Sequence, residues 1–123
     1  MDVVRCLDTY ALIEIYKGNP KFSGHLKKKF IITDITLAEF YSVLLREENE
    51  ETANYWAKKF EAYSIPISRD MILEAVRFRR KHNNTNISFF DAVGYIFSLR
   101  NGFYFVTGDK EFGKFKNVEF VKK

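Results

Sequence analysis

Residues 103–109, with the sequence FYFVTGD, decide the fold class of this chain. The first four of these residues are apolar, which is typical of a strand covered on both faces of a sheet. Residues 88–100, just before them, are apolar on nearly every side of a helix, so we expect a buried helix there that ends at Asn101-Gly102. A buried helix that leads into a buried strand predicts a βαβ unit and therefore a parallel sheet.

The same alternation of helix and strand patterns extends over the rest of the chain. Short apolar runs predict four more strands, at 3–7, 30–33, 64–68 and 118–121. Helical patterns lie between the strands, at 9–16, 21–28, 36–47, 53–60 and 68–82. Pro66 within the third run indicates an edge strand. We therefore expect an α/β fold in which a parallel sheet of about five strands forms a single domain, residues 1–123.

Composition excludes several classes of protein. Hydrophobic residues make up 46% of the 123 residues and charged residues 29%, which argues against a disordered chain. No apolar run approaches the roughly 18 residues of a membrane helix, and the first residues lack a signal-peptide pattern. We therefore expect a cytoplasmic protein with no membrane partner. The net charge of +4 permits binding to nucleic acid without requiring it.

The scarcity of cysteine and histidine narrows the possible chemistry. Cys6 is the single cysteine, so the chain has no internal disulfide and no multi-cysteine zinc site. His25 and His82 do not form a ligand-like pair, which leaves little basis for Ser-His or Cys-His catalysis. If the protein is an enzyme, we expect it to use carboxylates, together with a hard cation held by oxygen atoms.

Four acidic residues are predicted to meet at one edge of the sheet. Asp8 directly follows the first strand and Asp109 follows the fourth. Glu39 and Asp91 each lie one turn into an otherwise apolar helix, next to the carboxyl ends of strands. Ligands of open parallel sheets bind at this edge. The four positions therefore predict a carboxylate cluster.

A cluster of four carboxylates implies a cation. Their mutual repulsion would raise their pKa values and cost stability, and a divalent ion removes that conflict. Oxygen ligands suit Mg²⁺ or Mn²⁺, and such an ion lowers the pKa of a bound water and neutralises phosphate charge. The chemistry that this pattern favours is phosphodiester hydrolysis.

Each of these acids also has a purely structural interpretation. The pairs Thr36–Glu39 and Ser88–Asp91 have the spacing of capping boxes, and both Asp8 and Asp109 suit N-caps. Helix capping does not, however, require four acids at one edge. Two further acids are interpreted as turn or cap residues only, Asp34 and Asp70. Two basic stretches stay open between solvated surface and contact with a phosphate backbone, 27–29 and 77–81.

Four short motifs together resemble a known family. They are residues 7–9 (LDT), 36–40 (TLAEF), 88–92 (SFFDA) and 105–112 (FVTGDKEF). Their order and spacing are similar to those of the PIN-domain ribonucleases, particularly the small VapC-like toxins of prokaryotic toxin–antitoxin pairs. The resemblance extends over residues 3–121.

The resemblance implies a three-layer α/β/α sandwich and a metal-dependent endoribonuclease, the toxin of a type II toxin–antitoxin pair. It implies an RNA substrate, Mg²⁺ or Mn²⁺ as cofactor, a homodimer, and inhibition by a cognate antitoxin. Thr107 matches a family hydroxyl residue that orients an acid or a water, and Glu111 matches a peripheral acid. Tyr10 departs from the small residue of the family and is expected to narrow the groove. The residues that the family pattern assigns to catalysis and metal binding are Asp8, Glu39, Asp91 and Asp109.

Several other functions are compatible with part of this sequence pattern. A housekeeping PIN nuclease in RNA maturation and a catalytically silent PIN-like domain that binds RNA or a partner share the same motifs. A phosphorylation-driven receiver domain has this length and alternation, but the chain lacks an acidic pair after the first strand and a phosphate-accepting Asp at the end of the third. A dinucleotide-binding domain is disfavoured because no Gly-x-Gly-x-x-Gly follows any strand.

Overall fold

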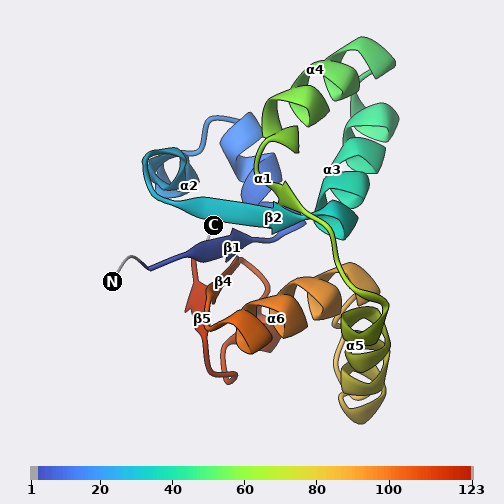
Figure 1. Cartoon of the computed structure of the whole chain (residues 1–123). Coiled ribbons are helices and arrows are strands. Elements are labelled where there is room, and N and C mark those ends of the chain that lie inside the picture. The colour runs from blue at the N-terminus through green and yellow to red at the C-terminus, as the bar shows by residue number, and fades with distance from the viewer. Residues whose placement is uncertain (1–2, 123) are drawn as a thin grey trace.

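Five parallel strands form the centre of the protein, whose computed structural model describes residues 3–122. Along the sheet the strands follow the order β3-β2-β1-β4-β5, and every neighbouring pair is parallel (Figure 1). The predicted α/β class with a five-stranded parallel sheet is therefore confirmed. The strands are β1 Arg5–Leu7, β2 Phe30–Thr33, β3 Ser64–Ile65, β4 Tyr104–Thr107 and β5 Val118–Phe120.

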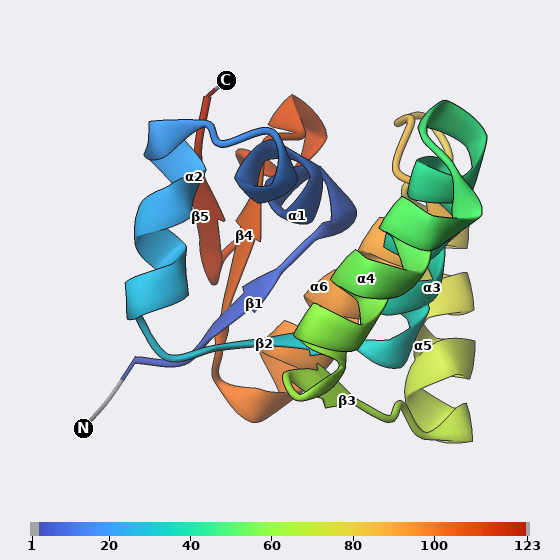
Figure 2. The same ribbon diagram turned by 90° about the horizontal axis from the view of Figure 1, so that it is seen from above.

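Helices cover both faces of the sheet, which produces the three expected layers (Figures 1 and 2). One face carries the first half of the chain, with α1 Thr9–Tyr16, α2 Pro20–Ser23, the 3₁₀ helix η1 Gly24–Lys27, α3 Asp34–Glu47 and α4 Glu50–Glu61. The other face carries α5 Arg69–Lys81 and α6 Phe89–Asn101. A second 3₁₀ helix connects β4 to β5, η2 Lys110–Phe112.

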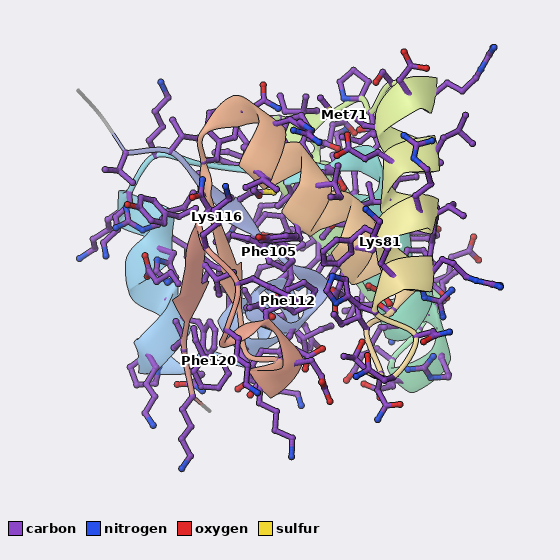
Figure 3. All side chains as sticks on the ribbon, turned by 90° about the horizontal axis from the view of Figure 1, so that it is seen from below. Met71, Lys81, Phe105, Phe112, Lys116 and Phe120 are labelled. Carbon is purple, nitrogen blue, oxygen red and sulfur yellow. The ribbon has the colours of Figure 1, made fainter. Side chains whose placement is uncertain are left out.

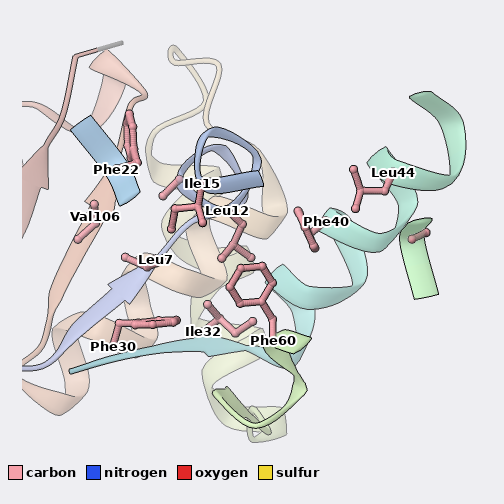
Figure 4. Close-up of a cluster of buried hydrophobic side chains, with 12 residues drawn as sticks. Leu7, Leu12, Ile15, Phe22, Phe30, Ile32, Phe40, Leu44, Phe60 and Val106 are labelled. Atoms are coloured by element: carbon pink, nitrogen blue, oxygen red, sulfur yellow. The ribbon is translucent and has the colours of Figure 1, made fainter. Parts of the chain in front are cut away.

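Alternation along the strands divides the interior into two hydrophobic cores. Leu7 and Val106 point toward α1–α4, into the cluster drawn in Figure 4. Their neighbours Cys6 and Phe105 point the other way, toward α5 and α6. Figure 3 shows Phe105 and Phe112 at the centre of that second face, beside α6. Successive side chains of a strand lie on opposite faces, so a sheet covered on both sides needs apolar residues at every position.

The central position of β1 sets the geometry of the carboxyl edge. β1 lies between β2 and β4, and Leu7 is in register with Val106, so both strands end at the same level. The Asp8 amide extends this pairing by donating to the Val106 carbonyl oxygen, at 3.1 Å. The strand order also excludes the receiver-domain alternative, because receiver-like sheets follow the order 2-1-3-4-5.

Most predicted elements are confirmed, but three strands are shorter than predicted: the two edge strands β3 and β5, and the central β1, which begins at Arg5 and not at Val3. β3 lies at an edge as Pro66 indicated, but it ends at Ile65, because proline has no N–H for the ladder. α6 ends at Gly102, which adopts the left-handed conformation with φ 69°. The expected helix 21–28 is divided into α2 and η1. No helix within residues 3–122 is long and apolar enough to cross a membrane.

One of the two predicted capping boxes is wrong. α3 begins at Asp34, and its N-cap is Thr33, whose hydroxyl accepts from the Thr36 amide at 3.0 Å. Thr36 is therefore inside the helix, and Glu39 lies in the second turn, too deep to cap the N-terminus. The second box is correct at its N-cap, because the Ser88 hydroxyl accepts from the Asp91 amide at 3.1 Å. Glu39 thus has no capping role that would explain its place in this helix.

Candidate active site

Asp8 lies at the point where β1 ends and α1 begins. It is the N-cap of α1, and its Oδ1 accepts a hydrogen bond from the Ala11 amide at 2.7 Å. The side chain is only 1% exposed, and the Thr107 hydroxyl is its second hydrogen-bond partner. Because β1 is central and its carboxyl end is covered by α1, this carboxylate is held deep in the edge of the sheet.

The turn after β4 brings Thr107 and Asp109 to the same edge. The Asp109 amide donates to Thr107 Oγ1 at 3.0 Å, and the Asp109 carboxylate caps η2 by accepting from the Glu111 amide at 2.9 Å. Gly108, between them, lies against the ring of Tyr10, where a Cβ atom would overlap the ring carbons. The turn is therefore fixed by its own hydrogen bonds and by an aromatic side chain from α1.

Glu39 reaches the site from α3 and is connected to α1 by one hydrogen bond. The donor is the Thr9 hydroxyl, and the acceptor is Glu39 Oε1. Thr9 directly follows Asp8, so this bond joins the residue after β1 to the helix after β2. Thr9 was singled out in the sequence only as part of the motif 7–9, and this contact was not predicted. The Asp-Thr pair after the first strand was its only local signal.

Asp91 reaches the site from the first turn of α6. Its helix runs toward the start of β4, so the N-terminal end of α6 lies at the carboxyl edge of the sheet. Asp91 is partly buried, and its carboxylate has a hydrogen bond with the side chain of Ser88. The Ser88 cap therefore determines where α6 begins and helps to orient the Asp91 carboxylate.

The charges of the four acids act on one another. Burial is the main cause that raises the pKa of Asp8 from 3.8 to about 7, and the charges of Asp109 and Glu39 raise it further. The hydrogen bonds from Thr107 and the Ala11 amide oppose this shift. Burial also raises the pKa of Asp91 to about 8, followed by the charges of Asp8, Glu39 and Asp109. All the charges that shift these two pKa values belong to acidic residues, so the repulsion is uncompensated.

The donor set suits a hard divalent cation. Four carboxylates supply only oxygen atoms, and Mg²⁺ or Mn²⁺ prefers such ligands and would relieve their repulsion. Within residues 3–122, no three acidic, histidine or cysteine side chains stand close enough to form a ready-made metal-binding group. The residues therefore fit the cation in chemistry and charge, and binding would require their side chains to move closer together. The residues in question are Asp8, Glu39, Asp91 and Asp109.

The other acids singled out in the sequence lie outside this cluster. Asp34 is exposed at the start of α3, where its carboxylate accepts from the Ser64 hydroxyl. Asp70 is exposed in the first turn of α5. Glu111 is partly buried on η2, where its amide donates to the Asp109 carboxylate. Asp34 and Asp70 therefore serve as matched reference positions for tests of the cluster.

Comparisons with known proteins agree with this arrangement. The family model described as "PIN domain" matches residues 5–118, and no curated protein matches the chain. Among solved structures, Mycobacterium tuberculosis VapC20, described as a sarcin-ricin loop cleaving toxin, has a TM-score of 0.77 at 16% identity over 93% of this chain and 98% of that chain. VapBC2 from Rickettsia felis, bound to a DNA fragment from its promoter, has a TM-score of 0.75 at 16% identity over 98% and 100%. PAE2754 from Pyrobaculum aerophilum has a TM-score of 0.73 at 23% identity over 98% and 92%. At these sequence identities, the comparisons with solved structures show a similar fold and nothing more.

Proposed function

Because the chain belongs to the PIN-domain family, we propose that it is a metal-dependent endoribonuclease that hydrolyses phosphodiester bonds of RNA. Family membership supports a nuclease in general terms. The observation that carries the finer proposal is the carboxylate cluster at the carboxyl edge of the parallel sheet: burial, and then the charges of the neighbouring acids, raise the pKa values of Asp8 and Asp91. A fold that is destabilised by such a cluster retains it because a cation and a phosphate ligand need it.

We assign the metal to Asp8, Glu39, Asp91 and Asp109. A bound Mg²⁺ or Mn²⁺ supplies positive charge that neutralises a phosphate group and acidifies a water molecule. Thr9 holds the Glu39 carboxylate in place, and Thr107 does the same for Asp8. A hydrogen bond with the Ser88 side chain does the same for Asp91 at the start of α6.

The biological setting that we propose is a toxin–antitoxin pair. The structural neighbours of this fold include a toxin–antitoxin complex from Klebsiella pneumoniae and DNA-bound VapBC from Salmonella typhimurium. By analogy, the chain would act on RNA in the cytoplasm as a homodimer and be inhibited by a cognate antitoxin. This part of the proposal rests on similarity of fold, and the carboxylate cluster does not depend on it.

A cleavage assay tests the proposed activity. The purified protein is incubated with end-labelled RNA and Mg²⁺ or Mn²⁺, beside Asp8→Asn and the exposed control Asp70→Asn. We expect cleavage by the wild type and by Asp70→Asn, and none by Asp8→Asn or in the presence of a chelator. RNA binding without cleavage would instead identify a silent RNA-binding domain. The absence of both binding and cleavage would contradict the proposal.

Expression in a bacterial host separates a toxin from a housekeeping nuclease. Growth arrest by the wild type but not by Asp8→Asn, relieved by a small protein encoded beside the gene, is expected of a toxin. Cleavage in vitro without any effect on growth would favour a nuclease in RNA maturation.

A further inference from the structure

A pocket of about 320 Å³ lies between the end of α5 and the start of α6. None of the side chains that line it is acidic, and several are hydrogen-bond donors. Apolar side chains also line it. Its lining residues are Val76, Arg79, Arg80, His82, Asn83, Thr85, Ile87 and Phe89. A cavity lined by cationic and apolar side chains suits an anion attached to a ring.

Arg79 is an exposed cation of this pocket that one hydrogen bond orients. Its Nε donates to the Ile87 carbonyl oxygen at 2.9 Å, which orients the guanidinium group. Within the part of the chain that the structure describes, its two terminal nitrogens have no hydrogen bond or ion pair. A planar guanidinium with two free nitrogens matches the oxygens of a phosphate group, and prior orientation reduces the entropy lost on binding.

The loop 82–87 is also held in place. The Thr85 hydroxyl donates to the His82 carbonyl oxygen at 2.6 Å. The His82 ring packs against Phe78 and Phe115, with ring centroids 4.5 Å and 5.0 Å apart. Arg80 and Asn83 are exposed and add further donors at the rim. Phe89 supplies an aromatic surface of the kind on which nucleobases stack.

The pocket and the carboxylate cluster both draw a residue from the first turn of α6. Phe89 is the first residue of α6 and precedes Asp91 by two positions. In Figure 2, the loop between α5 and α6 (pale orange) and η2 (orange) lie at the same end of the molecule, the end toward which β1 and β4 point. A ligand that extends from the cluster along this edge would therefore meet the pocket.

We propose that this pocket binds a nucleotide phosphate, with Arg79 and Arg80 on the phosphate oxygens and Phe89 against the base. The phosphate belongs either to an RNA strand whose neighbouring nucleotide lies at the carboxylate cluster or to a free mononucleotide. The RNA source rests on the proposed function, whereas the mononucleotide source does not. The pocket would then determine which nucleotide next to the cleaved bond is preferred.

Two variants that each remove one positive charge distinguish RNA binding at the pocket from general attraction by the basic surface. Arg80→Gln removes a cation from the pocket, and Arg77→Gln removes one from the other flank of α5, where Arg77 lines a different groove. RNA binding is measured with a chelator present, so that no strand is cut. We expect Arg80→Gln to weaken binding about tenfold and to reduce the salt slope by about 0.7 to 1, as for one lost phosphate contact. Arg77→Gln should change affinity by less than about twofold. Equal weakening by both variants would overturn the proposal.

A mononucleotide titration distinguishes an RNA strand from a free mononucleotide as the source of the phosphate. It also tests the pocket independently of the proposed nuclease activity. A 5′-mononucleotide is added to the wild type and to Arg80→Gln while NMR signals of His82 and Asn83 are followed. Saturable shifts in the wild type that Arg80→Gln loses would support the pocket even if RNA were neither bound nor cut. If RNA binding separates the variants but the mononucleotide causes no shift, the strand is the source. If neither ligand distinguishes Arg80→Gln from Arg77→Gln, the pocket is not a phosphate site, whether or not the protein cleaves RNA.

Discussion

The hydroxyl of Thr9 donates a hydrogen bond to the carboxylate of Glu39, and so connects α1 to α3 across thirty residues of sequence. Thr9 is buried and directly follows Asp8, so the bond holds two acids of the cluster in a fixed relation. It also orients Glu39, which the capping interpretation did not explain.

Thr9→Val removes the hydroxyl and keeps the shape of the side chain. We expect RNA cleavage to fall about tenfold, because Glu39 loses its orienting donor, while the free energy of unfolding changes by about 1 kcal/mol. Initial cleavage rates and urea unfolding measure the two effects. Ser64→Ala is the control, since it removes a similar hydroxyl–carboxylate bond, to Asp34, outside the cluster. Equal activity losses in both variants would contradict a specific role for Thr9.

Asp91→Asn should stabilise the metal-free protein and abolish cleavage. The folded-state pKa of about 8 exceeds the ordinary 3.8, so between about pH 4 and pH 8 the folded protein binds more protons than the unfolded chain. Wild-type stability therefore falls as the pH rises through this window, and asparagine, which does not ionise, removes the loss. We expect the variant to be about 1–2 kcal/mol more stable than the wild type at pH 8 and nearly equal to it at pH 4. Urea unfolding in a chelator at both pH values measures this difference. A variant less stable than the wild type at pH 8 would contradict the claim that ionised Asp91 destabilises the metal-free protein.

Divalent cations should stabilise the folded protein through the same acids. Binding to the folded state alone contributes about 2.7 kcal/mol at a concentration one hundred times the Kd, which corresponds to a rise in Tm of roughly 5–10 °C. We expect millimolar Mn²⁺ to produce this rise in the wild type and in Asp70→Asn, chelation to reverse it, and Asp8→Asn to lose most of it. A wild-type Tm that does not respond to Mn²⁺ or Mg²⁺ would count against a metal at this site.

Gly108→Ala should disturb the turn that carries Asp109. The added Cβ would overlap the ring of Tyr10, and an overlap of this kind costs about 1–3 kcal/mol of stability. Tyr10→Ala opens the space, so the double variant should recover part of the stability lost in Gly108→Ala. A double-mutant cycle by urea unfolding measures this coupling. Effects of the two substitutions that simply add would show that the ring does not constrain the turn.

Local signals were sufficient for most elements and for one of the two capping boxes. The apolar run before Thr107 and the buried helix before it predicted β4 and α6, because periodicity reports which faces are covered. The start of α3 was missed because Thr33 and Thr36 both suit an N-cap, and only the backbone conformation of Thr33 decides between them. The N-cap lies three residues earlier than predicted, at Thr33 and not at Thr36, which moves Glu39 from a capping position into the second turn.

The amino-acid sequence by itself determined the α/β class, the approximate elements and the four acids at strand and helix ends, because hydrophobic period, turn residues and caps act within a few residues. Only the tertiary structure decided that β1 is central, that Thr9 holds Glu39, and that Arg79 faces a pocket without acids. Those relations depend on which elements cross in space and on how much water they exclude. Burial and long-range hydrogen bonds are properties of the packed chain. So are the raised pKa values of Asp8 and Asp91, which burial causes first and the charges of the neighbouring acids second.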